Sequence, residues 1–288
     1  MEYSTPLTVP PKKAREYSQR FKKATHDTGN LFLFAGDQKV EHMNDDFVGA
    51  NIPDVAADPE HYFKIASQAN IGVFATHLGL IARYGRDYKD VPYLVKLNGK
   101  TNLIPKEDKD PLSRRWIDVG DVVSFQEDSK LPIMGVGYTV YLGSEFESLM
   151  LHQAAEIVVD AHRHGMLAVL WIYPRGEAVK DEKDIHIIAG AAGVGLALGA
   201  DFVKVNYPYS DDPKTSAEQY KEVTTAAGKA GVLCVGGSKQ DSDVYLSHVK
   251  EQINTAGARG VAVGRNIYQN SVEDAIAVAN SISEIVYS

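Results

Sequence analysis

The sequence predicts an α/β fold, a closed (β/α)8 TIM barrel that forms a single domain with an N-terminal helical extension. Three observations favour this fold: short apolar runs recur along the chain, most are followed by a longer segment with helical periodicity, and eight runs fit within 288 residues. Near-continuous apolar strands that alternate with amphipathic helices are typical of a parallel sheet covered on both faces. Eight such units in a chain of this length are typical of a closed barrel.

The chain begins with an extension, residues 1–30, in which the basic stretch PKKAREYSQRFKK has helical spacing. We interpret this stretch as a solvated helix face, and we assign residues 31–288 to the barrel. The eight expected strands lie at 31–37, 72–79, 92–99, 133–143, 166–174, 201–208, 231–239 and 260–266. The helical segments between them lie at 59–69, 145–164, 185–198, 216–230, 242–255 and 271–286.

The stretch 100–130 is less regular, and we expect it to hold the third helix within a long connection. An open doubly wound sheet is the alternative fold. That fold usually has fewer strands and needs a glycine-rich phosphate turn, whereas the segment AGDQKVEH at the first strand contains no G-x-G-x-x-G motif.

The composition excludes several classes of function. A formal net charge of -8 argues against nucleic-acid binding. No apolar run approaches the roughly 18 residues that span a bilayer, and the first residues lack the apolar core of a signal peptide, so we expect no membrane contact and a cytoplasmic location. The single cysteine, Cys234, predicts neither an internal disulfide nor a thiolate zinc site, and suits a small apolar filler in a strand.

The histidines show no H-x-x-x-H or H-E-x-x-H spacing. We therefore expect no metal site and no cofactor, although the sequence leaves a carboxylate-bound Mg²⁺ open.

Lys204 lies in the middle of the apolar run DFVKVNYP. Strand side chains alternate between faces, so Lys204 shares a face with Phe202 and Asn206, while Val203 and Val205 share the other. Because the outer face of a barrel packs against helices, the valine face is outward and Lys204 points into the barrel. Burial there lowers the pKa of the amine, and a neutral amine can attack a carbonyl to form an iminium that accepts electrons when a neighbouring carbon–carbon bond breaks.

The same alternation places Asp37, Lys96, Trp171 and Tyr173 inside the barrel. Lys96 is either a rival amine or a second cation whose repulsion lowers the pKa of Lys204. A simple ion pair between Lys204 and Asp37 is the alternative to catalysis. The Tyr173 phenol suits proton transfer between a substrate hydroxyl and a carbanion in a site that excludes water, while Trp171 and Tyr173 also suit ordinary barrel packing.

The ends of the seventh and eighth strands carry the motifs GGSK (236–239) and GR (264–265). Glycine backbones allow close approach of a ligand, and Lys239 and Arg265 add positive charge. Barrels of this kind often bind phosphate at these two loops, so the motifs predict a phosphate site.

The segments GADFVKVNYP, WIYPRG, VGGSK and AVGRNIYQ, together with an aspartate in the first strand, resemble the archaeal-type class I fructose-bisphosphate aldolases, which belong to a group with deoxyribose-phosphate aldolase-like barrels. The resemblance extends from about Leu31 to the end of the chain. It implies a metal-independent aldolase of glycolysis and gluconeogenesis that cleaves a phosphorylated sugar, and a homo-oligomer built from rings of barrels, such as a decamer. It implies Schiff-base formation at Lys204, proton transfer by Tyr173 beside Trp171, a carboxylate role for Asp37, and phosphate binding around Gly236, Gly237, Gly264 and Arg265. We also expect Trp171, Arg175, Lys96 and Ser238 to bind substrate.

The first strand departs from the pattern of many relatives, which have Asp-His-Gly where this chain has Asp37 followed by Gln38 and Lys39. Lys39 either adds a cation for a second phosphate or marks a different substrate. Enzymes of the same branch that transfer a ketose fragment, such as 2-amino-3,7-dideoxy-heptulosonate synthase, or that act on phosphorylated autoinducer sugars, therefore stay open as alternatives. A non-catalytic phosphosugar-binding barrel, or an isomerase in which Lys204 is only a cation, is the alternative from another class.

Overall fold

The computed structural model describes residues 4–104 and 110–288, and it confirms the predicted closed barrel. Within these residues eight parallel strands pair in chain order, and β8 closes the barrel by pairing with β1. The strands are β1 (Leu31–Ala35), β2 (Val73–His77), β3 (Tyr93–Lys96), β4 (Ile133–Leu142), β5 (Leu167–Pro174), β6 (Phe202–Val205), β7 (Gly231–Val235) and β8 (Gly260–Val263).

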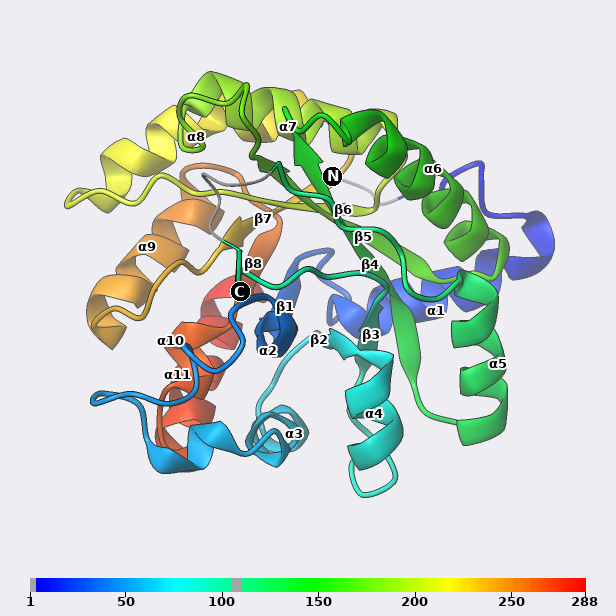
Figure 1. Cartoon of the computed structure of the whole chain (residues 1–288), viewed down its shortest axis with the longest axis horizontal. Helices are drawn as coiled ribbons and strands as arrows, with labels where there is room; N and C mark the ends of the chain where they lie inside the picture. Colours follow the sequence, from blue (N-terminus) through cyan, green and yellow to red (C-terminus); the bar gives the residue numbers. More distant parts are fainter. Residues whose placement is uncertain (1–3, 105–109) are drawn as a thin grey trace.

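Helices surround the strands as an outer layer, with α7 and α8 on one side of the barrel and α3 and α4 on the other (Figure 1). The long helices are α1 (Ala14–Ala24), α3 (Glu60–Gln68), α5 (Val119–Ser129), α6 (Glu147–Arg163), α7 (Ile185–Ala197), α8 (Pro213–Ala227), α9 (Ser242–Asn254) and α11 (Val272–Val286). The shorter ones are η1 (Pro11–Lys13), α2 (Gln38–Glu41), η2 (Asp54–Ala57), α4 (Leu78–Tyr84) and α10 (Arg265–Tyr268).

The packing confirms which strand face points outward. Gly195 of α7 lies so close to the sheet that a Cβ on it would approach Val203 to 2.1 Å and Ile172 to 3.1 Å. On the opposite face, a Cβ on Gly137 of β4 would meet the Trp171 ring at 2.4 Å. The valine of β6 therefore packs against a helix, and the indole fills the inside of the barrel.

Several elements begin or end elsewhere than predicted. The predicted strand at 72–79 ends at His77, because α4 starts directly at Leu78 without a loop that the sequence would reveal. Strands β6, β7 and β8 end at Val205, Val235 and Val263, so the polar residues that we assigned to the tips of these strands lie beyond them. Parallel barrel strands stop where their tips leave the sheet, so these tips are loops at the carboxyl end of the barrel.

The helix predicted at 216–230 begins earlier, at Pro213, with Asp212 accepting a hydrogen bond from the backbone N–H of Lys214 as a cap. Proline at the first helical position and aspartate before it are normal start signals. The helix ends at Ala227 because Gly228 has a φ of 55°, which does not continue the helix. The third helix of the connection 100–130 is α5, and residues 105–109 of that connection lie outside the described residues.

The basic N-terminal helix α1 packs one face against the amino-terminal end of the barrel. Its buried Tyr17 donates a hydrogen bond to Asp201, and Phe21 stacks on Phe202 at 5.9 Å between ring centres. Arg20 donates to the carbonyl oxygen of Gly165 at 2.6 Å. The extension therefore covers the barrel end opposite to the strand tips.

Candidate active site

A cavity of about 80 Å³ lies at the carboxyl ends of the barrel strands. Its walls combine an amine, a phenol, carboxylates and a glycine-rich loop, which is the expected place for chemistry in a barrel. The described residues that line it are Asp37, Gln38, Glu41, His42, Trp171, Tyr173, Lys204, Val235, Gly236, Gly237, Ala262, Gly264 and Arg265.

Lys204 points into this cavity from β6, and only 4% of its surface is exposed. It pairs in register with Trp171 of β5, and its Nζ lies 5.1 Å from the centre of the Trp171 ring. No hydrogen bond or ion pair joins this Nζ to another described residue. Burial lowers the pKa of Lys204 and the positive charge of Lys96 lowers it further, while the attraction of Asp37 opposes both.

A second lysine, Lys96 of β3, is fully buried beside the first. Its Nζ lies 3.3 Å from Asp37, 4.0 Å from Glu41 and 4.9 Å from the centre of the Trp171 ring. Burial alone would raise the pKa of Asp37, but the two lysines outweigh it and hold that pKa below its usual range. Asp37 is therefore a carboxylate that can only accept hydrogen bonds.

Tyr173 follows Trp171 by two residues on β5, and its ring lies within stacking distance of Tyr141 at 6.5 Å between centres. Burial raises the pKa of its phenol well above the usual value, and the negative charges of Glu41 and Asp37 raise it further. The phenol is therefore protonated in the free protein. It is a proton donor that becomes a strong base once its proton has left.

The loop after β7 is held in place by the buried side chain of Asn266. Its amide donates to the carbonyl oxygens of Gly236 (2.8 Å) and Ser238 (3.2 Å) and accepts from the N–H of Gln240 (2.9 Å). Arg265 Nε donates to the carbonyl oxygen of Gly237 at 3.1 Å. The carbonyl groups of this loop are thus paired. The N–H groups of Gly237 and Ser238 meet no acceptor among the described residues, so they are available to an anion.

Some residues expected at the site do not line the cavity. Arg175 forms a two-point ion pair with Glu182, at 3.1 Å for each contact, and lies over the rings of Tyr141 and Tyr173. Lys96 does not line the cavity but forms an ion pair with Asp37, which does. Ser238 is exposed, and its backbone carbonyl oxygen accepts the hydrogen bond from Asn266.

Lys239 and Lys39, which the sequence suggested as further phosphate ligands, also point away from the cavity. Lys239 donates to the carbonyl oxygen of Gln269. Lys39 lies over the Phe47 ring at 4.3 Å and reaches Asn44 and the carbonyl oxygen of Ala57. Neither side chain lines the cavity.

The site also contains residues that we did not predict, namely Gln38, Glu41 and His42. They lie on and just after the short helix α2, where positions three and four residues apart share a face. The sequence carries Gln38, Glu41 and His42 at the three- and four-residue spacing of one helix face. A helix of a single turn is too short to show a periodic pattern, so this spacing could not be recognised in advance.

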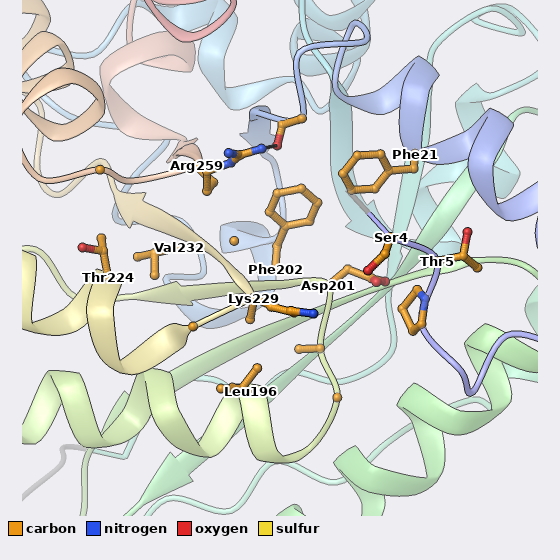
Figure 2. Close-up of a pocket in the computed structure, with 18 of the residues that line it drawn as sticks. Ser4, Thr5, Phe21, Leu196, Asp201, Phe202, Thr224, Lys229, Val232 and Arg259 are labelled. Atoms are coloured by element: carbon orange, nitrogen blue, oxygen red, sulfur yellow. Dashed lines mark hydrogen bonds between the residues drawn. The ribbon is translucent and has the colours of Figure 1, made fainter. Parts of the chain in front are cut away.

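A second and larger cavity, of about 570 Å³, lies at the opposite end of the barrel between α1 and the starts of β6 and β7. Figure 2 shows Phe21, Phe202 and Val232 among its apolar walls, with Lys229 and Arg259 as its cations. Its carboxylate, Asp201, accepts from Tyr17 and from the N–H of Ala168 and contacts His162. The smaller cavity is the candidate active site, because its amine, Lys204, is buried and it lies at the strand tips.

Within residues 4–104 and 110–288, no group of three histidine, cysteine, aspartate or glutamate side chains lies in a position to hold a metal ion. None of the helices in this described part of the chain combines the length and the apolar character needed to cross a bilayer.

Comparison with known proteins gives a consistent result. The family model described as DeoC/LacD family aldolase matches residues 31–270. The fructose-bisphosphate aldolase/6-deoxy-5-ketofructose 1-phosphate synthase of Methanocaldococcus jannaschii is 53% identical over 99% of this chain and 90% of its own.

Two solved structures share the fold closely. The fructose-bisphosphate aldolase of Slackia heliotrinireducens superposes with a TM-score of 0.96 at 48% identity, over 99% of this chain and 90% of its own. An archaeal fructose-1,6-bisphosphate aldolase whose catalytic lysine is covalently bound to the carbinolamine intermediate of its substrate has a TM-score of 0.78 at 33% identity, over 94% of this chain and 100% of its own. The chain is an enzyme of the DeoC/LacD aldolase family.

Proposed function

We propose that this aldolase is a class I fructose-bisphosphate aldolase, which cleaves fructose 1,6-bisphosphate to dihydroxyacetone phosphate and glyceraldehyde 3-phosphate and runs the reverse condensation. The observation that carries this proposal is the buried, unpaired amine of Lys204 in a cavity that also contains Tyr173, Asp37 and the loops of β7 and β8. The similarity to relatives named fructose-bisphosphate aldolase supports the substrate.

The reaction begins when the neutral amine of Lys204 attacks the C2 carbonyl of the open-chain sugar to give a carbinolamine. Tyr173 gives its proton to the leaving hydroxyl, so water departs and an iminium remains. The Tyr173 phenolate then accepts the proton of the C4 hydroxyl while the C3–C4 bond breaks and its electron pair moves into the iminium. The aldehyde leaves, Tyr173 returns the proton to C3, and hydrolysis of the iminium frees Lys204 and dihydroxyacetone phosphate.

The neighbouring groups assist each step. Asp37 accepts hydrogen bonds from substrate hydroxyls and so orients them. Lys96 keeps Asp37 ionised and opposes protonation of Lys204. The N–H groups of the β7 loop and the cation Arg265 hold one phosphate. Arg175, over the Tyr173 ring, can meet the rest of a long phosphorylated substrate once its contact with Glu182 loosens.

Borohydride reduction in the presence of dihydroxyacetone phosphate tests the proposal. The adduct mass should appear on the peptide that contains Lys204, and activity should disappear with it. The variant Lys204→Met should give no adduct, whereas a label on Lys96 would overturn the assignment. Incubation with fructose 1,6-bisphosphate and EDTA should yield both triose phosphates, and a loss of activity under EDTA would contradict a metal-independent reaction.

A second candidate is the transfer of the dihydroxyacetone phosphate unit to another aldehyde. The name of the Methanocaldococcus jannaschii relative, which combines an aldolase with a synthase activity, favours testing it. A second acceptor such as glycolaldehyde, offered beside glyceraldehyde 3-phosphate, distinguishes the two, because a strict aldolase ignores it. Assembly into a homo-oligomer and a cytoplasmic location stay predictions.

A further inference from the structure

Gln38 is a cavity residue to which the mechanism above gives no role. It begins helix α2 directly after Asp37, and its side chain lines the cavity together with Glu41, three residues further along the same helix face. Its side-chain oxygen Oε1 is buried and has no hydrogen-bond partner among the described residues. A buried polar group without a partner is unfavourable, and one on a residue that lines a cavity can gain a partner from a molecule bound there.

The position of the amide indicates what that partner is. The Gln38 side chain lies against Gly264, the residue that follows β8: a Cβ on Gly264 would lie 2.5 Å from Gln38 Nε2 and 3.1 Å from its Cδ. The two come together because β1 and β8 pair in register, with Phe34 opposite Val263. The amide nitrogen is therefore at the phosphate loop, while the amide oxygen is buried and unpaired.

An amide offers two donors at its nitrogen and an acceptor at its oxygen. A phosphate ester supplies only acceptors to the nitrogen, and a sugar hydroxyl supplies a donor to the oxygen. A phosphorylated hydroxyketone carries both groups within a few bonds of each other. It therefore matches both ends of the Gln38 side chain at once.

We propose that Gln38 is a substrate-binding residue, whose amide nitrogen donates a hydrogen bond to the phosphate held at Gly237 and Arg265 and whose oxygen accepts one from a substrate hydroxyl. The inference rests on the proposed function, since it assumes that the phosphate of the substrate occupies these loops. It gives Gln38 a share in selecting phosphorylated over unphosphorylated substrates.

Two variants separate the ends of the amide. Gln38→Met keeps the length of the side chain and removes both hydrogen bonds, whereas Gln38→Glu keeps an acceptor and places a negative charge beside the phosphate. The measurement is the concentration of ketone that half-saturates the borohydride-trapped adduct, with dihydroxyacetone phosphate and with unphosphorylated dihydroxyacetone. Gln68→Met, the same exchange at an exposed position of α3, is the control.

Gln38→Met should raise the half-saturating concentration of dihydroxyacetone phosphate by about tenfold or more, the size expected for a lost hydrogen bond to a charged group. Gln38→Glu should raise it further. For dihydroxyacetone, which has the hydroxyl but lacks the phosphate, the rise should be smaller in Gln38→Met and smaller still in Gln38→Glu, which keeps an acceptor for the hydroxyl. Gln68→Met should match the wild type. An equal rise for both ketones, or no rise for either, overturns the proposal.

Failure of the proposed function gives a different result, because the wild type then traps no adduct with either ketone. In that event the tryptophan fluorescence of the full chain, titrated with inorganic phosphate, still tests Gln38. Weaker phosphate binding in Gln38→Glu than in the wild type supports the assignment. Equal binding, or no binding in either protein, refutes it.

Discussion

Replacing Lys96 with methionine should shift the pH dependence of the enzyme. The ammonium groups of Lys96 and Lys204 lie 4.9 and 5.1 Å from the centre of the same Trp171 ring. They are therefore at most about 10 Å apart, and like charges at that distance repel by roughly 1.7 kcal/mol at an effective dielectric constant of about 20. Such a repulsion adds to the effect of burial in lowering the pKa of Lys204.

Lys96→Met removes this repulsion and also frees Asp37 from its contact at 3.3 Å, so that the carboxylate attracts Lys204 more strongly. Both effects raise the pKa of Lys204. Because only the neutral amine reacts, the acidic limb of the profile of kcat/KM against pH should move to higher pH. The lost repulsion of roughly 1.7 kcal/mol corresponds to about tenfold or more lower activity on the acidic side of the profile.

The assay is kcat/KM for fructose 1,6-bisphosphate across the pH range, with the rate of borohydride trapping as a second measurement. Adding Asp37→Asn to the variant removes the attraction, so the limb should move back towards the wild-type position. Lys100→Met, which removes a cation 5.8 Å from the Tyr141 ring, is the matched control and should leave the limb in place. A limb that stays unchanged in Lys96→Met, or moves to lower pH, would refute the reasoning.

Three further predictions follow from the same contacts. Tyr173→Phe should slow the formation of the trapped adduct on Lys204 and lower kcat by about 10²- to 10⁴-fold, and an unchanged kcat in a steady-state assay would exclude the proton-transfer role. Asn266→Ala should raise KM for phosphorylated substrates about tenfold with a smaller effect on kcat, since it releases the β7 loop; a change in kcat alone would contradict this. Gly260→Ala should lower the free energy of unfolding by about 2 kcal/mol or more in denaturant titrations, because its φ is 139° and a Cβ would lie 1.9 Å from a backbone oxygen of β1. Gly120→Ala, with nothing within 4 Å of its Cβ, should leave stability nearly unchanged.

The barrel and its inward side chains were predictable from the sequence, because strand alternation is a local rule. Once the valines of β6 are assigned to the helix-facing side, the position of Lys204 inside the barrel follows without any knowledge of its neighbours. The same rule placed Lys96, Trp171 and Tyr173 correctly, since each of them lies within a regular strand.

The loop side chains were not predictable in this way, because tertiary contacts rather than periodicity direct them. Lys239 sits in a glycine-rich loop that suggested a phosphate ligand, yet the carbonyl oxygen of Gln269 holds its ammonium group. Arg175 likewise faces Glu182, seven residues further along the chain. Gln38 was noted only as a departure from a family motif, and its place in the cavity depends on the absence of a side chain at Gly264.

The arrangement of charges also bears on which lysine reacts, a question that strand alternation leaves open. Lys96 has a carboxylate within 3.3 Å and a second within 4.0 Å, so its ammonium group is held in direct ion pairs. Lys204 is buried as well but has no direct ion pair with any residue that the structure describes, so burial favours its neutral form. The two lysines therefore have opposite roles. Lys96 keeps Asp37 ionised and opposes protonation of Lys204, and Lys204 is left free to attack a carbonyl. Exchanging these parts would require Asp37 to leave Lys96 for Lys204, which is why a borohydride label on Lys96 would contradict the electrostatics as well as the mechanism.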